Sequence, residues 1–186
     1  DLWKKFKSVK VSASLDAMGP HAEFIRKGTK WQDIEDNRNA MLQELPNFEF
    51  DICPTVSLMN VMHLPDFIED WTNRGLLGVG QVRLNNLLDP KHLCIQTLPK
   101  EYKKRVSQRW LQHLDWTLAT GELNPDIWPS NEFINSAKGT INFMNTADRS
   151  YMIPITIREF ERWDRIRKEN WKIALPELAF MGDDIG

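Results

Sequence analysis

Cysteine is scarce in this chain, and neither sign of charge dominates it. The 186 residues include two cysteines, Cys53 and Cys94, whose separation fits neither a disulfide framework nor a C-x-x-C metal site. Basic and acidic residues number 24 and 26, which leaves a formal net charge of -2. Such a balance argues against the basic surface of proteins that bind nucleic acids or anionic membranes.

Long apolar segments are also absent. No run approaches the roughly 20 residues that cross a bilayer, and the opening DLWKKFKSVK lacks the apolar stretch and cleavage site of a signal peptide. We therefore expect a cytoplasmic protein with no nucleic-acid and no membrane partner. The chain has no initial methionine and reaches its first predicted strand within a few residues, so we expect a piece of a longer protein. Its 41% hydrophobic content still supports a real core.

The hydrophobic pattern alternates between strands and helices up to residue 98. Such alternation predicts right-handed βαβ units, a parallel sheet and an α/β fold, although three strands cannot close a barrel. Beyond residue 98 the pattern is helical only, which predicts two parts, 1–98 and 99–186, the second an α-helical extension. The predicted strands cover 9–15, 48–56 and 79–84. A short helix is predicted between Pro20 and Arg26, and longer helices are predicted over 31–45, 64–74, 100–119, 131–145 and 156–170.

Polar side chains gather where the first predicted strand ends. Ser12, Ser14 and Asp16 occupy alternate positions, so their side chains share one face of the strand. Ligands of α/β folds bind at the carboxyl ends of strands, where two hydroxyls and a carboxylate suit a ribose. Small residues that only pack, with Asp16 capping the next turn, explain the pattern equally well. Arg26 either reaches back to a carboxylate or lies on a solvated helix.

The second and third predicted strands end in similar polar residues. Thr55, Ser57 and Asn60 follow the second strand, and Asn85 and Asn86 end the third, where a turn and a ligand contact are both open interpretations. A role at the start of a helix or in the core suits His63 better than acid–base catalysis, because no nucleophile or carboxylate stands at a diagnostic spacing. Both cysteines are expected to be buried apolar residues, and a core or interface is expected for the tryptophans, among them Trp110, Trp116, Trp163 and Trp171.

Three sequence blocks, in this order, resemble one known family. They are S-x-D-A-x-G, E-x-I-R-x-G and a tryptophan over 14–31, T-V-x-x-x-N-x-x-x-L-P over 55–65, and D-P-x-x-L-x-I-Q-x-L-P over 89–99. INFMNTADR and FERWDRIRKENWKIALPEL extend the likeness to the final helices. The chain resembles radical SAM proteins of the SPASM/twitch group over nearly its whole length. The resemblance implies the C-terminal half of a partial (β/α)6 TIM-like barrel, followed by the helical extension.

The resemblance also implies a chemistry and its cofactors. In the family a C-x3-C-x2-C loop holds a 4Fe-4S cluster that binds S-adenosylmethionine, and reduction yields a 5'-deoxyadenosyl radical that abstracts hydrogen from the substrate. Cys53 and Cys94 cannot ligate such a cluster, so its ligands are expected in a preceding part and this chain alone is expected to be inactive. The substrate is open: the group often modifies peptides or proteins, and small molecules and sugars are alternatives. The reductant is a protein such as flavodoxin or ferredoxin.

The matching positions carry the implied cofactor contacts. By resemblance Ser14 and Asp16, with Ser12 as a companion, contact the S-adenosylmethionine ribose or its surroundings, and Arg26 pairs with the methionyl carboxylate. Contacts to adenine and substrate fall to Thr55, Val56 and Asn60, and Asn85 faces the substrate.

Two other functions compete with this one. The first is a non-catalytic binding or scaffold module derived from a (β/α) barrel. The second is a phosphate-binding barrel hydrolase or isomerase, which is disfavoured because neither a glycine-rich phosphate loop nor an acid–base pair is evident. Exposed edges of a partial parallel sheet also predict that the chain aggregates when isolated.

Overall fold

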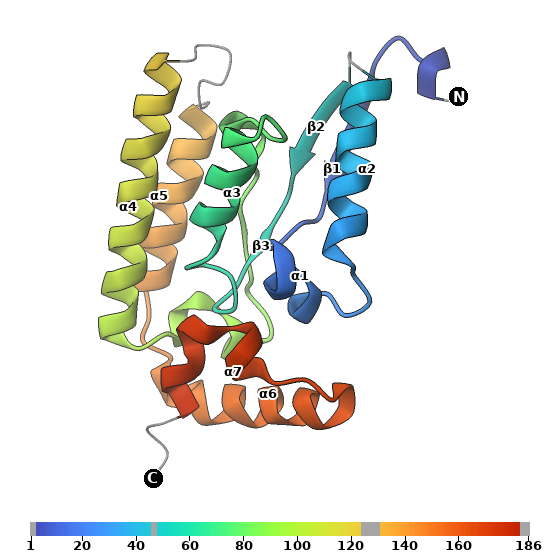
Figure 1. Cartoon of the computed structure of the whole chain (residues 1–186). Helices are drawn as coiled ribbons and strands as arrows, with labels where there is room; N and C mark the ends of the chain where they lie inside the picture. Colours follow the sequence, from blue (N-terminus) through green and yellow to red (C-terminus); the bar gives the residue numbers. More distant parts are fainter. Residues whose placement is uncertain (1–2, 46–47, 124–130, 183–186) are drawn as a thin grey trace.

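The structure, a computed structural model, describes residues 3–45, 48–123 and 131–182 of a mixed α/β protein (Figure 1). After a short 3-10 turn η1 (Trp3–Lys5), strand β1 (Val9–Ala13) pairs in parallel with β2 (Phe48–Ile52). Helices α1 (Gly19–Ile25) and α2 (Trp31–Glu44) connect the two strands. The predicted βαβ unit is therefore confirmed, with β1 ending two residues earlier than expected.

The predicted strand 48–56 is divided at Pro54. Proline has no N–H for a sheet hydrogen bond, so β2 ends before it and a short strand β3 (Thr55–Val56) follows. Strand β3 pairs in parallel with β4 (Asn85–Asn86), and an isolated parallel bridge joins Ile52 to Val82. In the described part of the chain the strands thus form two short parallel two-stranded sheets, and no closed barrel is present.

The predicted strand 79–84 is wrong over its first half, where the chain forms a 3-10 turn η2 (Val79–Gln81). Glycines at 78 and 80 favour a strand little, and the Gln81 side-chain oxygen accepts a hydrogen bond from the Gly78 N–H at 3.0 Å. This local bond closes the turn, so sheet pairing starts only at Val82 and continues in β4.

Helix α3 (Leu64–Asn73) follows the predicted boundaries closely. His63 immediately precedes it and Pro65 lies in its first turn, where the missing N–H leaves no helical bond unmade. The helix stops before Gly75, whose φ of 69° lies in the left-handed region that glycine adopts without strain. Two predictions are therefore confirmed: His63 lies at the start of a helix, and Gly75 ends that helix.

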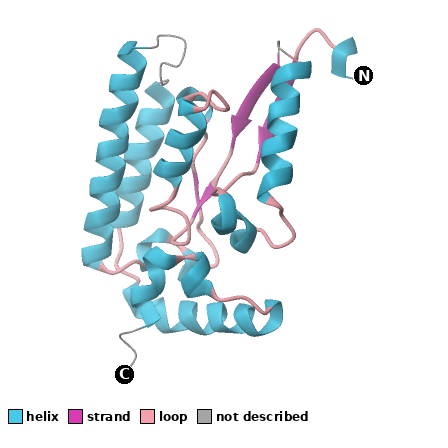
Figure 2. Ribbon diagram, in the orientation of Figure 1, coloured by secondary structure: helices cyan, strands magenta, loops and turns pink. Residues whose placement is uncertain are grey.

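Helices and 3-10 turns make up most of the remaining chain (Figure 2). Helix α4 runs four residues beyond its predicted end, and α6 starts three residues early because Pro154 occupies its first turn. The elements are η3 (Lys91–Leu93), η4 (Ile95–Thr97), α4 (Lys100–Leu123), α5 (Asn131–Asn145), η6 (Ser150–Met152), α6 (Ile153–Arg167), α7 (Trp171–Ala174) and η7 (Pro176–Gly182). Within the described residues, no helix is both long and apolar enough to cross a membrane.

The core is rich in aromatic side chains. Trp71 and Trp110 are fully buried, and the Trp110 indole N–H donates a 2.7 Å hydrogen bond to the Val61 carbonyl oxygen. The predicted core role holds for Trp110 and Trp171, whereas Trp116 and Trp163 are half-buried against the core. Cys94 is buried as expected, but Cys53 is only half-buried. One buried cluster takes residues from both sides of position 98, and the division into two parts there stays a prediction.

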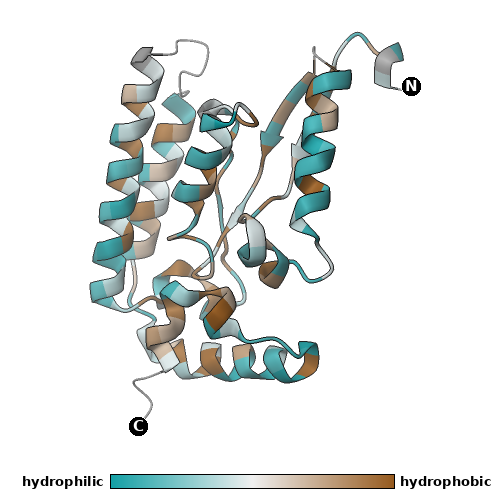
Figure 3. Ribbon diagram, in the orientation of Figure 1, coloured by the Kyte–Doolittle hydropathy of each residue, from teal (hydrophilic) through white to brown (hydrophobic). Residues whose placement is uncertain are grey.

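The two faces of the β1–β2 sheet differ sharply. Phe50 packs on Trp71 of α3, and the guanidinium of Arg38 from α2 lies 4.2 Å from the Phe50 ring centroid, so helices cover the apolar face. Figure 3 shows that α2 is hydrophilic along most of its length. Lys10 and Ser12 point to the opposite face and are exposed. Parallel sheets are normally covered on both faces, so a polar, uncovered face is unusual.

Candidate functional site

Asp16 links the ends of two parallel strands. It follows β1 with only 6% of its surface exposed. One carboxylate oxygen accepts a hydrogen bond from the Arg26 Nε–H at 2.7 Å, and the other accepts one from the Thr55 backbone N–H at 2.7 Å. Met18, not Asp16, precedes α1, and no side chain caps that helix, so the capping interpretation of Asp16 is wrong. The carboxylate instead holds the end of β1 against the start of β3.

Arg26 terminates α1 and points back to the strand ends. Its Nε is held by Asp16, and among the described residues no hydrogen bond involves its two terminal nitrogens. Its side chain is 43% exposed, whereas that of Asp16 is 7% exposed. The buried carboxylate therefore orients a guanidinium whose outer edge remains available to an anion. Of the two interpretations of Arg26, the structure shows the contact with a carboxylate, and Asp16 is the partner.

Asn60 braces the same junction from the loop after β3. Its side-chain amide donates hydrogen bonds to the carbonyl oxygens of Asp16 and Thr55, at 2.9 and 3.0 Å. Its side-chain oxygen accepts a 2.8 Å hydrogen bond from the Ser57 backbone N–H. Asn60 is completely buried and its hydrogen-bonding groups are engaged, so it shapes the site without reaching a ligand in this arrangement.

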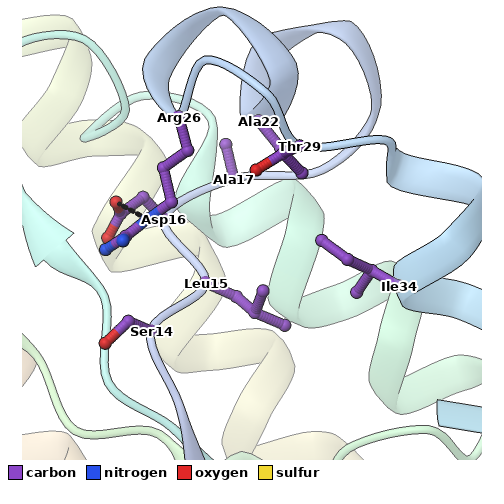
Figure 4. Close-up of a pocket in the computed structure, with 8 residues that line it drawn as sticks. All are labelled: Ser14, Leu15, Asp16, Ala17, Ala22, Arg26, Thr29 and Ile34. Carbon is purple, nitrogen blue, oxygen red and sulfur yellow. Dashed lines mark hydrogen bonds and ion pairs between the residues drawn. The ribbon is translucent and has the colours of Figure 1, made fainter. Parts of the chain in front are cut away.

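A small pocket lies beside this junction. Its volume is about 110 Å³, and its apolar wall includes Leu15 and Ile34. Figure 4 shows the Ser14 hydroxyl, the Asp16 carboxylate and the Arg26 guanidinium on one side of the chain, with Leu15 and Ile34 directed toward each other on the other. The complete lining is Ser14, Leu15, Asp16, Ala17, Ala22, Arg26, Thr29 and Ile34. A pocket this size admits a small group and not a whole nucleoside, since ligand cavities usually exceed about 300 Å³.

The remaining predicted residues divide by exposure. Ser12 and Ser14 are exposed on the uncovered face, and Asn85 is exposed beside Thr55, its partner in the β3–β4 pair. Val56 is completely buried, so its side chain would have to be uncovered to contact adenine. The fold thus brings the three predicted strand ends together, and the individual ligand contacts stay predictions.

Two stacked histidines were not foreseen by sequence reasoning. The rings of His21 and His63 lie 4.2 Å apart at an angle of 15°. The Nε2 of His21 is 2.7 Å from the Met59 carbonyl oxygen and 3.0 Å from a carboxylate oxygen of Glu177. Both neighbours are acceptors, so this nitrogen carries a proton. His21 and Glu177 are 156 positions apart by their residue numbers, and no sequence pattern signals the contact.

His63 is the histidine held neutral. Its Nε2 accepts a hydrogen bond from the Met18 backbone N–H at 3.3 Å, which requires an unprotonated nitrogen. Burial and the neighbouring His21 lower the pKa of His63 from its usual 6.5 to about 4. The pair ties the segment after Asp16 to the start of α3, next to the Asp16 junction.

A second ionic network lies between α3 and α4, away from the strand ends. The His113 ring nitrogen Nδ1 is 2.7 Å from Glu69, which also accepts a 2.9 Å hydrogen bond from Arg109. Burial alone would raise the pKa of Glu69, but the hydrogen bonds from His113 and Arg109 outweigh it and hold the pKa below its usual value. The network fixes α4 to α3 and is structural.

No group of three or more histidine, cysteine, aspartate or glutamate side chains able to hold a metal occurs in the described ranges. Comparison with known proteins finds no matching family model, no similar curated protein and no similar solved structure. The function must therefore be inferred from the residues and geometry of the site.

Proposed function

We propose that this chain forms the later strands of a partial (β/α)6 radical SAM barrel and supplies part of its S-adenosylmethionine site. In such an enzyme, reductive cleavage of S-adenosylmethionine at a 4Fe-4S cluster supplies a 5'-deoxyadenosyl radical for hydrogen abstraction. The enzyme of this proposal is cytoplasmic and takes electrons from a protein such as flavodoxin or ferredoxin. Peptides and proteins are among its candidate substrates. It builds on the sequence resemblance and on two features of the fold.

The observation that carries the proposal is the Arg26–Asp16 pair at the strand ends. The buried carboxylate fixes the guanidinium through Nε, and the terminal nitrogens remain free among the described residues. An arginine fork presented in this way fits a carboxylate in a bidentate manner. The methionyl carboxylate is therefore the part of S-adenosylmethionine that Arg26 would bind, and the Ser14 hydroxyl would face the same ligand.

The uncovered face of the parallel sheet gives separate support. Exposed polar residues line it, including Lys10, Ser12 and Ser14, whereas the opposite face is apolar and packed under helices. A sheet that forms one wall of a polar chamber has this asymmetry. The neighbouring strands of a barrel would complete that chamber and cover the open edge of β1.

The two implied cofactors fit the chain differently. The free edge of Arg26 and the adjoining pocket of about 110 Å³ suit the carboxylate end of S-adenosylmethionine. The cluster does not fit the described residues, because they include no set of three metal-ligating side chains. Cluster ligands from a preceding cysteine loop are therefore part of the proposal, and the role of this chain is to bind and orient.

One observation favours the alternative, a non-catalytic scaffold module. Both oxygens of Asp16 already accept hydrogen bonds, Asn60 is fully engaged, and Val56 is buried. A network this satisfied stabilises the fold whether or not a ligand binds. The two functions differ in whether the free edge of Arg26 has a ligand.

Binding of S-adenosylmethionine to this chain tests the proposal directly. Isothermal titration should give measurable binding that Arg26→Gln weakens about tenfold, which corresponds to the loss of about 1.4 kcal/mol from a charge-assisted contact. Arg158→Gln is the matched control, because Arg158 is an exposed arginine on α6 away from the site. No binding, or equal binding by Arg26→Gln, would favour the scaffold module.

Activity provides a second test in the longer product. The coding sequence extended upstream would be expressed anaerobically with reconstituted iron and sulfide, and release of 5'-deoxyadenosine measured under reduction. We expect release that falls sharply in Arg26→Ala and Asp16→Ala. An upstream region without a cysteine loop, or no cleavage despite an intact cluster, would contradict the proposed function.

A further inference from the structure

A cluster of charges on the uncovered face of the sheet has no role in cofactor binding. Asp51 of β2 lies opposite Ser12 and points to this face. One of its oxygens is 3.2 Å from the Lys10 ammonium and 3.3 Å from the Arg83 Nε. The Asp51 side chain is 6% exposed, whereas those of Lys10 and Arg83 are 48% and 56% exposed. A buried carboxylate thus anchors two accessible cations.

The Asp51 carboxylate is held in its charged form. Burial alone would raise its pKa, but hydrogen bonds from Ser12 and Lys10 and the charges of Lys10 and Arg83 outweigh this effect and hold the pKa below its usual value. Because Asp51 is charged and nearly inaccessible, it positions its partners and does not itself meet a ligand.

Most donors of the two cations remain available. Arg83 contacts Asp51 through its Nε, and in the described part of the chain its terminal nitrogens make no hydrogen bond. The Lys10 ammonium has three donors and contacts Asp51 and, more loosely at 3.6 Å, the exposed Glu49. Arg83 on Asp51 thus resembles Arg26 on Asp16: in both pairs a buried carboxylate contacts the Nε of an exposed arginine. At the two sites together, the accessible charged side chains are the cations Lys10, Arg26 and Arg83 and the carboxylate Glu49.

We propose that Lys10 and Arg83 bind an oxyanion of the substrate, a carboxylate or a phosphate group. This inference rests on the proposed function, in which the uncovered face lines the reaction chamber. A guanidinium edge with an ammonium beside it matches the shape and charge of such a group. The substrate is then an acid, held on the chamber wall by residues distinct from those that hold the cofactor.

Titration of the isotopically labelled chain with inorganic phosphate, and separately with acetate, tests this inference. Ionic strength is held constant with sodium chloride, and the backbone amide resonances of positions 10, 51 and 83, which every variant retains, are followed by NMR. We expect a saturable shift with at least one of the two anions, and about tenfold weaker binding in Arg83→Gln. The anion that binds more tightly identifies the group. Arg83→Lys retains the charge without the fork and should bind with intermediate affinity.

Arg158→Gln is the control for loss of a positive charge, and circular dichroism verifies that each variant is folded. Shifts that do not saturate, or phosphate and acetate affinities that are equal in Arg83→Gln and the parent chain, would overturn the inference. S-adenosylmethionine binding is measured in the same samples. Arg83-dependent anion binding without Arg26-dependent S-adenosylmethionine binding would overturn the proposed function and leave the anion site in place. The reverse result would overturn only the anion site.

Discussion

Acid should destabilise this protein through His63 before most carboxylates titrate. Burial and, to a lesser extent, the neighbouring His21 lower the pKa of His63 to about 4, whereas an unfolded chain has a histidine pKa near 6.5. Above pH 6.5 neither state is protonated. As the pH falls from 6.5 toward 4, the unfolded state binds a proton and the folded state does not, so the free energy of unfolding decreases.

The size of this effect follows from the two pKa values. Each pH unit between them costs about 1.4 kcal/mol, so the full loss approaches about 3 kcal/mol. Partial exposure of His63 reduces this figure, and about 2–3 kcal/mol is expected. Losses below pH 4 then come from carboxylates with lowered pKa values, such as Asp51 and Glu69.

The measurement is urea unfolding of the chain and of His63→Gln at several pH values between 7 and 4. At pH 7 we expect the variant to be less stable by about 1 kcal/mol, because it loses the ring stacking and the acceptor for the Met18 N–H. Near pH 4 the order should reverse, since the variant has no histidine to protonate at this position. Carboxylate titration affects both proteins alike and cancels in the difference.

His92→Gln is the matched control, because it removes a histidine outside the stacked pair. Parallel stability curves for the parent chain and His63→Gln would refute the reasoning. They would mean that the imidazole is protonated equally easily in the folded and unfolded states.

Other consequences of the structure can be measured separately. Asp16→Ala should lower the free energy of unfolding by about 2–4 kcal/mol, because the strand-end N–H and the guanidinium both lose their acceptor, and urea titration would measure it. Asn60→Ala removes three hydrogen bonds, two of them buried, and should cost about 2–4 kcal/mol, whereas a loss below about 1 kcal/mol would contradict the bracing role. Trp110→Phe should cost about 1–3 kcal/mol in the same assay, because a buried carbonyl loses its donor. The open edge of Val9–Ala13 should promote self-association, which light scattering would detect, and a monomer that unfolds cooperatively would argue against an incomplete barrel.

Sequence reasoning was most reliable where local rules control the backbone. The apolar spacing located α2, α3 and α5, and Gly75 was correctly predicted to end a helix because its positive φ suits glycine. It was weakest around residues 79–84. A third short strand was predicted over these residues, but a hydrogen bond from the Gly78 N–H to the Gln81 side chain closed a turn over their first half instead.

At the candidate site, the sequence predicted which residues would lie close together but not which hydrogen-bond partners their side chains would have. Strand ends of a parallel sheet meet at one edge, so Asp16, Thr55 and Asn85 could be placed together in advance. Their hydrogen-bond partners depend on side-chain directions and burial, which no local pattern encodes. Asp16 was therefore expected to touch a ribose or cap a turn, while the structure shows both its oxygens bound within the protein.

The sequence alone determined the alternation of strands and helices, the helical second half and the polar strand ends, because these depend on residue spacing and backbone preference within a few positions. Only the tertiary structure decided the contacts that join distant segments. The stacking of His21 on His63, the link of His21 to Glu177 and the anchoring of Lys10 and Arg83 by one buried carboxylate all arise from packing. Burial and proximity set the charge state and the accessibility of these groups, and both exist only once the chain has folded.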